Sequence, residues 1–108
     1  MAVSNDFIEF IIDQLSGFGE VTVRKMFGGA GLYQEGKMFG LVSDDVAFLK
    51  VDDTTRPKFE AAGSEPFSPY TDKPAMTSYF EIPPDILENP AELSVWAAES
   101  LLIQKKKK

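Results

Sequence analysis

The sequence predicts an α+β domain in which helices cover one face of an antiparallel sheet. Apolar residues recur at helical spacing near both ends of the chain, whereas residues 21–53 form short β-branched and aromatic runs. The turns between these runs suit hairpins, which join antiparallel strands. We therefore expect two layers in the order α-β-β-β-α-β-α. With 108 residues, 44% of them hydrophobic, the chain can bury one core, so residues 1–104 form one predicted domain and residues 105–108 a basic tail.

Two helices are predicted on either side of residues 21–53, an amphipathic helix before them and a short helix after them. The first follows Asp6, with Glu9 three positions later as in a capping box and Gly17 where the helix would stop. A shorter helix is predicted at residues 55–62 and ends before Gly63. The apolar face of the first helix consists of Phe7, Ile8, Ile11, Ile12 and Leu15.

Strands are predicted in the runs VTVRKMF, AGLYQ, KMFGLVS and VAFLKV. The pairs Glu35-Gly36 and Asp44-Asp45 are predicted hairpin turns, and Gly36 can supply the positive φ that a tight turn needs. The first two runs are interpreted as one long strand. Three glycines are predicted to let this strand bulge and change direction: Gly28, Gly29 and Gly31.

The C-terminal part of the chain predicts one more strand and a closing helix. The run TSYFEI is a predicted strand that Pro83-Pro84 ends. The helix has the strongest local signals, since Asn89 can cap it, Pro90 fits its first position and Glu92 completes the capping box. Its predicted buried face consists of Leu93, Trp96, Ala97 and Leu101.

Residues 31–37, GLYQEGK, have the spelling of a phosphate-binding loop, G-x-x-x-x-G-K. Such a loop needs a Ser or Thr after the lysine and a helix directly afterwards, but here Met38 opens a strand-like run. The glycines at 28–31 also lack dinucleotide spacing, because Gln34 stands where Gly or Ala is needed. We therefore interpret the segment as structural, with both Met-Phe pairs in one core: Met26, Phe27, Met38 and Phe39.

The composition predicts no catalytic, cofactor-binding or metal site. The chain contains neither cysteine nor histidine, which excludes disulfides, thiolate or imidazole metal ligands, and Ser-His or Cys-His nucleophile pairs. Asp44-Asp45 and Asp52-Asp53 lie at opposite ends of one predicted strand, too far apart to share a metal or a proton. The sequence therefore predicts a protein that is not an enzyme.

The charge distribution disfavours direct binding of nucleic acid. The net charge is −6, but Lys105 to Lys108 contribute four of the eleven basic residues, so residues 1–104 carry seven basic and seventeen acidic side chains, or −10. An acidic body repels phosphate. The N-terminus does not have the pattern of a signal peptide, and no apolar run reaches the roughly 18 residues that cross a membrane. We expect no membrane association and a cytoplasmic location.

A candidate interaction surface lies around the glycine-rich hairpin and consists of Arg24, Lys25, Tyr33 and Lys37. Strand alternation places Arg24 and Lys25 on opposite faces of the sheet. Two interpretations stay open: a small anion-binding patch, or solvated strand edges where lysine discourages unwanted pairing.

Several short motifs occur in a fixed order along the chain. RKMFGG occupies residues 24–29, GLY residues 31–33, GKMFG residues 36–40 and FLK residues 48–50. Gly63, Pro66-Phe67, the run from Met76 to Tyr79 leading to Pro83, and Trp96 follow. Over about residues 5–103, this set resembles the N-terminal domain of the TfoX/Sxy family. We interpret the motif residues as structural, namely Met26, Phe27, Gly28, Gly29, Gly31, Gly36, Phe39 and Trp96.

The resemblance implies a sheet of about five strands, with a short extra strand near Phe67 and the order α-β-β-β-α-β-β-α. Members of the family include regulators of natural competence that are thought to act with the cyclic-AMP receptor protein at promoters. Longer members carry a second, helical domain. The family supplies no catalytic residues to carry over.

We therefore expect a non-enzymatic protein-interaction module, an accessory regulator of transcription or competence that acts through a protein partner. Two alternatives belong to other classes. One is a small-ligand binder or enzyme, including a methyltransferase, that uses the glycine-rich hairpin with Arg24, Tyr33 and Lys37. The other is weak nucleic-acid binding through the lysine tail, although lysines at a helix end also serve solubility and the helix dipole.

Overall fold

The computed structural model describes residues 5–26, 29–43, 46–67 and 76–106. They form helices and an antiparallel sheet, which confirms the predicted α+β class. The helices are α1 (Asn5–Gln14), α2 (Arg56–Ala61), α3 (Pro84–Leu87) and α4 (Pro90–Lys106). The strands are β1 (Thr22–Met26), β2 (Gly29–Gln34), β3 (Lys37–Ser43), β4 (Val46–Lys50), β5 (Pro66–Phe67) and β6 (Met76–Glu81).

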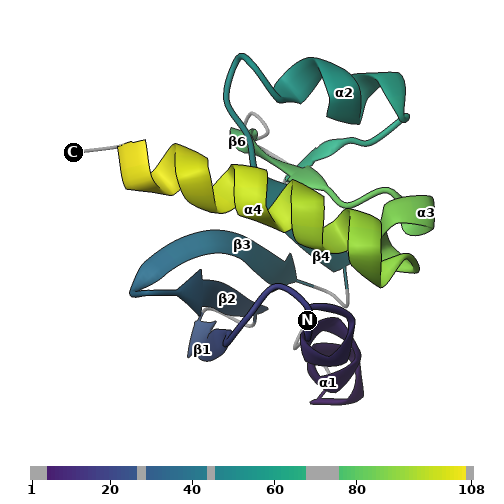
Figure 1. Ribbon diagram of the computed structural model, residues 1–108. Helices are drawn as coiled ribbons and strands as arrows, with labels where there is room; N and C mark the ends of the chain where they lie inside the picture. Colours follow the sequence, from purple (N-terminus) through teal and green to yellow (C-terminus); the bar gives the residue numbers. More distant parts are fainter. Residues whose placement is uncertain (1–4, 27–28, 44–45, 68–75, 107–108) are drawn as a thin grey trace.

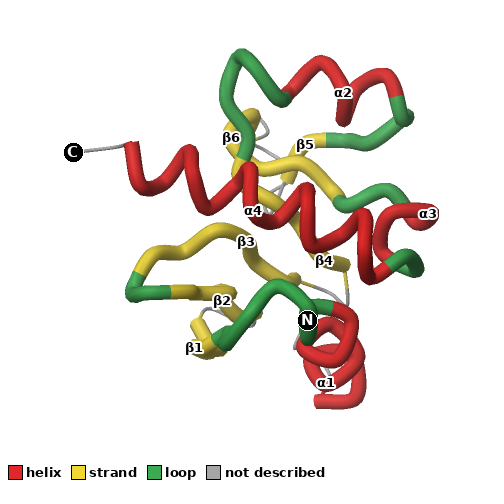
Figure 2. The backbone as a smooth tube through the Cα atoms, viewed as in Figure 1, coloured by secondary structure: helices red, strands yellow, loops and turns green. Residues whose placement is uncertain are grey.

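The six strands form one sheet in the order β1-β2-β3-β4-β6-β5, and every pair is antiparallel (Figure 1). The predicted count was one strand short, because the segment predicted as one long strand is a hairpin of β1 and β2. These two strands pair from Thr22 with Tyr33 to Met26 with Gly29, and residues 27–28 lie outside the described residues. The short strand expected near Phe67 is β5, which borders β6 at the edge of the sheet (Figure 2).

An irregularity in the pairing of β2 with β3 places an aromatic ring in the core. Tyr33 pairs with Met38 but Leu32 pairs with Gly40, so Phe39 is an extra residue on β3. A β-bulge of this kind changes the direction in which side chains project. The side chain of Phe39 is fully buried, and its ring lies 5.1 Å from that of Phe18 in an edge-to-face arrangement.

The described glycines of β2 form regular pairs, so the predicted bulge at these positions was wrong. Gly29 pairs with Ser43 and Gly31 pairs with Leu41, while Gly28 lies outside the described residues. At Gly29 the two strands approach so closely that a Cβ atom would lie 2.4 Å from the carbonyl oxygen of Val42. Position 29 therefore requires glycine because the backbone of β3 occupies the space that a side chain would need, and not because β2 bends there.

The turn between β2 and β3 is the predicted two-residue hairpin. Glu35 and Gly36 have φ values of 56° and 78°, which fits a turn in which both central residues are left-handed. Between β3 and β4, Ser43 pairs with Val46, as a hairpin requires, and the predicted turn residues Asp44 and Asp45 lie outside the described residues.

The core lies between one face of the sheet and the helices, as predicted. Helix α4 lies across β3 and β4 (Figure 1). Two side chains of α4 bind the sheet backbone: Ser100 Oγ donates a hydrogen bond of 2.8 Å to the carbonyl oxygen of Lys50, and Gln104 donates one to Met38. The buried core includes Ile11, Leu15, Leu32, Phe39, Val42, Leu49, Phe59, Phe80, Leu93, Ala97 and Leu101.

The predicted buried face of α4 is correct for three residues and partly correct for the fourth. Leu93 and Ala97 are fully buried and Leu101 is buried. Trp96 is half-buried and packs edge-to-face on Phe59, with 4.8 Å between ring centroids. It therefore joins α4 to α2 instead of lying at the centre of the core.

The helix signals predicted in the C-terminal part of the chain agree with the structure more closely than those predicted in its N-terminal part. Asn89 Oδ1 accepts a hydrogen bond of 3.2 Å from the backbone N–H of Glu92, as expected of a cap. Asp6, predicted as the cap of the first helix, is instead its second residue. Pro83-Pro84 ends β6 as predicted, but the sequence analysis missed the single-turn helix α3 that begins at Pro84.

Candidate functional site

Two of the four residues of the predicted interaction surface meet on the side of the sheet away from the core. Arg24 on β1 pairs with Gly31, and Tyr33 on β2 pairs with Thr22. The guanidinium carbon of Arg24 lies 5.5 Å from the centroid of the Tyr33 ring, within the range of a cation–π contact. Arg24 is exposed and Tyr33 is half-buried.

The other two residues occupy register positions of the opposite, helix-covered side. Lys25 pairs with Ala30, which is buried on the core side, and Lys37 pairs with Gln34, whose side chain reaches toward the loop after α1. Both lysines are exposed. The structure therefore brings Arg24 and Tyr33 together and separates them from Lys25 and Lys37.

The side of the sheet away from the core continues into a packed cluster of a lysine and aromatic rings. Lys50 pairs with Tyr79, and its ammonium nitrogen lies 5.1 Å from the centroid of the Tyr79 ring. Both residues are buried. Burial raises the pKa of the Tyr79 hydroxyl, and the nearby Tyr33 raises it further, so the neutral phenol is favoured. The two side chains of this cluster are therefore packed against the sheet and largely shielded from solvent.

The G-x-x-x-x-G-K segment has none of the backbone geometry of a phosphate loop. Residues 31–34 belong to β2, Glu35 and Gly36 form the turn, and Lys37 begins β3. A phosphate loop instead leads into a helix whose N-terminus faces the anion. The strand that was predicted to follow Lys37 is present.

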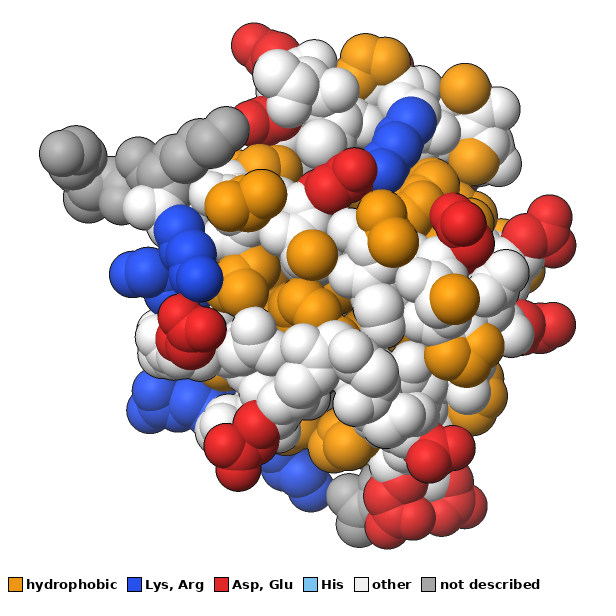
Figure 3. All heavy atoms as spheres, viewed as in Figure 1, with side chains coloured by type: hydrophobic (Ala, Val, Ile, Leu, Met, Phe, Trp, Pro, Cys, Tyr) orange, Lys and Arg blue, Asp and Glu red, His pale blue; other side chains and the backbone are white. Residues whose placement is uncertain are grey.

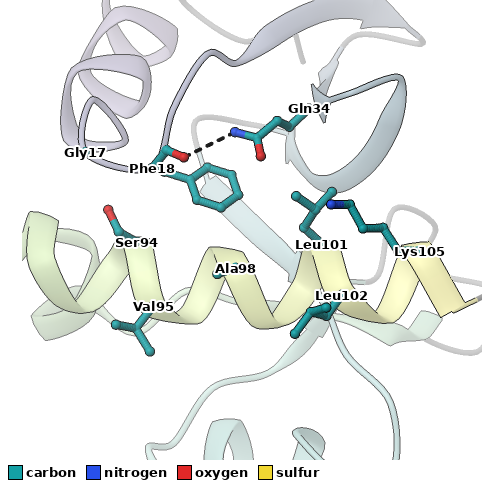
Figure 4. A pocket seen from close by; sticks show the side chains of 9 residues that line it. All are labelled: Gly17, Phe18, Gln34, Ser94, Val95, Ala98, Leu101, Leu102 and Lys105. Atoms are coloured by element: carbon teal, nitrogen blue, oxygen red, sulfur yellow. Dashed lines mark hydrogen bonds between the residues drawn. The ribbon is translucent and has the colours of Figure 1, made fainter.

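A groove on the other side of the molecule combines apolar walls with a few polar groups. Its volume is about 470 Å³, and it lies between α4 and the loop that joins α1 to β1 (Figure 4). We call it the α4 groove. It is lined by Gly17, Phe18, Gln34, Ser94, Val95, Ala98, Leu101, Leu102 and Lys105.

The wall opposite α4 is held in place by the hairpin of β2 and β3. The Gln34 amide nitrogen donates to the carbonyl oxygens of Phe18 and Glu20, each at 3.3 Å. At one end of the α4 groove, the Lys105 ammonium lies 3.2 Å from a carboxylate oxygen of Glu35. Figure 4 shows the Gln34 amide, the Ser94 hydroxyl and the Lys105 side chain around an otherwise apolar surface. These contacts anchor the wall of the groove to the sheet.

The outer side of α4 carries an apolar stripe that adjoins the groove. Val95 is 53% exposed and Leu102 is 54% exposed, high values for large apolar residues, and Ala91 and Ala98 are exposed beside them. In Figure 3, apolar side chains lie along the course of α4. Sequence reasoning missed this stripe. The signal was present, because Ala91, Val95, Ala98 and Leu102 recur at spacings of four, three and four residues.

In the described residues, the acidic side chains are not grouped around a metal site, and the buried polar side chains are hydrogen-bonded. Within residues 5–26, 29–43, 46–67 and 76–106, no group of three or more acidic side chains is placed to hold a metal ion. In the same ranges, every buried side-chain nitrogen or oxygen has a hydrogen-bond partner. Asp52 illustrates this, since its Oδ1 accepts from the backbone N–H of Thr54 at 2.9 Å in a turn before α2.

The sequence of residues 13–103 matches the TfoX N-terminal domain. The chain belongs to the TfoX N-terminal domain family. This membership confirms the resemblance drawn from the RKMFGG and GKMFG motifs. The family is associated with regulation of competence for DNA uptake and is not known for enzymatic activity. A comparison with curated proteins gives no match. None of the helices described for this TfoX N-terminal domain is long and apolar enough to cross a membrane.

Proposed function

We propose that this chain is a non-enzymatic protein-interaction module that acts as an accessory regulator through a protein partner. The observation that carries the proposal is the exposed apolar stripe that lies beside the α4 groove. Family membership supports the regulatory role, and the resemblance suggests a transcription regulator such as the cyclic-AMP receptor protein as the partner class.

The α4 groove has the dimensions and chemistry of a seat for one helix of another chain. From Ser94 to Lys105 it follows α4 for about three turns, or roughly 16 Å. Burial of apolar area contributes about 25 cal/mol per Å², so covering Val95 and Leu102 favours association. Amphipathic helices bind such grooves through apolar anchors spaced three and four residues apart.

A matched pair of substitutions tests the proposal. Ala98 on α4 and Ala61 on α2 are both exposed helical alanines, so Ala98→Glu and Ala61→Glu introduce the same change at different surfaces. We expect Ala98→Glu to weaken partner binding at least tenfold, because a charge would be buried in an apolar contact, and Ala61→Glu to leave it unchanged.

Binding is measured by co-purification from native lysate and by titration with purified cyclic-AMP receptor protein. Circular dichroism checks that both variants fold. Equal recovery of partners by the wild type and by Ala98→Glu would remove α4 as the contact surface. If the purified receptor protein does not bind while another protein is lost only in Ala98→Glu, the interaction role stands and the partner class is wrong.

A further inference from the structure

We propose that the polypeptide that binds the α4 groove is a second copy of this chain, with the two α4 helices packed antiparallel about a twofold axis near Ala98. This inference rests on the proposed function, because it uses the same stripe as the contact surface, so a regulator that binds there would compete with the second copy. Three observations carry it: the heptad spacing of the stripe, the positions of its small residues, and the charges at its two ends.

The stripe has the pattern of a two-helix seam. Ala91, Val95, Ala98 and Leu102 are spaced by four, three and four residues, which is the a/d spacing of a coiled coil. All four are exposed, whereas the opposite side of α4 is buried against the sheet. One helix thus carries two apolar sides, of which the fold uses only one.

The small residues of the stripe favour close packing of two helices. Ala91 and Ala98 are seven residues apart and therefore occupy the same heptad position. Small side chains let two helix backbones approach closely, with the larger Val95 and Leu102 on either side of the alanine at the centre of the contact. In an antiparallel pair centred near Ala98, Val95 of one copy lies opposite Leu102 of the other, which matches the two large residues across the seam.

The charges at the ends of α4 select the antiparallel direction. Glu88 and Glu92 are exposed at the start of the helix, and Lys105 is exposed at its end. Figure 3 shows acidic side chains on the side where α4 begins, and both basic and acidic side chains on the side where it ends. The antiparallel pair places Glu92 of each copy near Lys105 of the other, and it also opposes the two helix dipoles. A parallel pair would bring like charges together.

The size of the stripe sets the expected strength of the dimer. About this axis the apolar contact extends from Val95 to Leu102, about 10 Å of helix, with the pairs of Glu92 and Lys105 at its two ends, so the interface falls at the small end of specific contacts. We expect a reversible dimer with a dissociation constant on the order of 10 μM. Salt screens the attraction between Glu92 and Lys105, but it also screens the repulsion between the two acidic protein bodies. We therefore expect moderate salt to change the dissociation constant of the dimer only slightly.

Cysteine trapping tests the direction of packing, because the wild-type chain has no cysteine. Ala98→Cys should form a disulfide-linked dimer under mild oxidation, and Ala61→Cys on α2 serves as the collision control. A mixture of Val95→Cys with Leu102→Cys should give mainly the mixed dimer. Val95→Cys alone should crosslink poorly, because its two copies would lie about 10 Å apart along the seam, beyond the reach of a disulfide.

Each outcome of the trapping experiment decides the proposal. Preferential crosslinking of Ala98→Cys and of the mixed pair supports the antiparallel dimer. Efficient crosslinking of Val95→Cys with itself would indicate a parallel pair and overturn the proposal. Equal crosslinking of Ala61→Cys and Ala98→Cys would show random collision and also overturn it.

Charge reversal at the two ends provides an independent test by sedimentation equilibrium of the full chain. Glu92→Lys and Lys105→Glu should each raise the dissociation constant about threefold, and the double variant should recover most of the loss. Lys105 also pairs with Glu35 within one chain, so recovery by the double variant is the informative readout. A chain that stays monomeric at several hundred micromolar, more than tenfold above the expected dissociation constant, would overturn the dimer.

Failure of the dimer can be distinguished from failure of the proposed function. If the chain is monomeric but Ala98→Glu still abolishes binding of another protein, the second copy is excluded and the interaction module stands. If the chain is monomeric and Ala98→Glu changes no binding, both proposals fail.

Discussion

The β1–β2–β3 hairpins contain a conspicuous sequence motif that has a structural role, whereas helix α4 exposes an apolar surface that the motifs did not predict. Residues 22–43 contain five glycines and a G-x-x-x-x-G-K spelling, yet Gly29 serves the close approach of two strands and Gly36 serves a turn. Helix α4 carries only a capping signal and Trp96 among the motif residues, yet it exposes Val95 and Leu102 and forms one wall of a groove. In this chain, the glycine-rich motif reflects backbone geometry, whereas the proposed binding surface was recognised from the exposure of apolar side chains.

The largest expected effect lies in the hairpins. Gly29→Val should destabilise the fold by at least about 4 kcal/mol or prevent folding, because the new Cβ atom would overlap a backbone carbonyl of β3 that cannot move alone. Urea unfolding followed by circular dichroism measures this change. Gly36→Ala is the matched control: its site is open but φ is positive, so a cost of about 1 kcal/mol is expected. Similar small losses for both variants would contradict the close approach at Gly29.

The two sides of α4 should differ strongly in stability. Leu93→Ala removes a fully buried side chain and should cost about 2 to 4 kcal/mol, with the cavity included. Leu102→Ala removes a side chain that is 54% exposed and should cost less than about 0.5 kcal/mol. Thermal and urea unfolding of the two variants, at a concentration where the chain is monomeric, give the comparison. A large loss for Leu102→Ala would mean that the outer side supports the fold itself.

The buried position of Tyr79 predicts that the protein loses stability at alkaline pH. The folded state raises the pKa of Tyr79 above its ordinary value of 10.0, so the unfolded chain releases this proton first as the pH rises. The stabilising contribution is complete below pH 10 and is lost as the pH rises through the folded pKa. Tyr79→Phe should therefore lose less stability than the wild type as the pH rises from 9 to 11. Parallel pH profiles of the two proteins would contradict this.

The smallest effect is expected at the lysine of the G-x-x-x-x-G-K spelling. Lys37 is exposed at the start of β3, so Lys37→Ala should change the free energy of unfolding by less than about 0.5 kcal/mol. Partner binding should also be unchanged, because Lys37 does not line the α4 groove. Isothermal titration with ATP should show no binding to either protein. ATP affinity that disappears in Lys37→Ala would restore the phosphate-loop interpretation.

Local signals in the sequence predicted the elements that local physics decides. The cap at Asn89 and the turn at Glu35-Gly36 depend on a few neighbouring residues, and both are present. The bulge at Phe39 was not predictable in this way, because it depends on the register between β2 and β3. Helix α3 has four residues, too few to show helical periodicity.

The candidate site was less predictable than the fold. Arg24 and Tyr33 were selected with Lys25 and Lys37, but the pairing of β1 and β2 places these residues on two sides of the sheet. The α4 groove was missed because its walls come from segments about 80 residues apart, near Phe18 and Ser94. No local pattern joins them.

By itself, the sequence determined the α+β class, the absence of cysteine and histidine chemistry, the acidic body and the strand that follows Lys37. These properties depend on composition and on interactions between near neighbours. The sequence also predicted the buried side of α4, because Leu93, Ala97 and Leu101 recur at helical spacing. Only the tertiary structure decided that Val95 and Leu102, on the other side of this helix, adjoin a groove. The groove requires α4 to lie beside the loop after α1, a segment far from it in the sequence. Gln34 holds this loop to the sheet through hydrogen bonds to the carbonyl oxygens of Phe18 and Glu20.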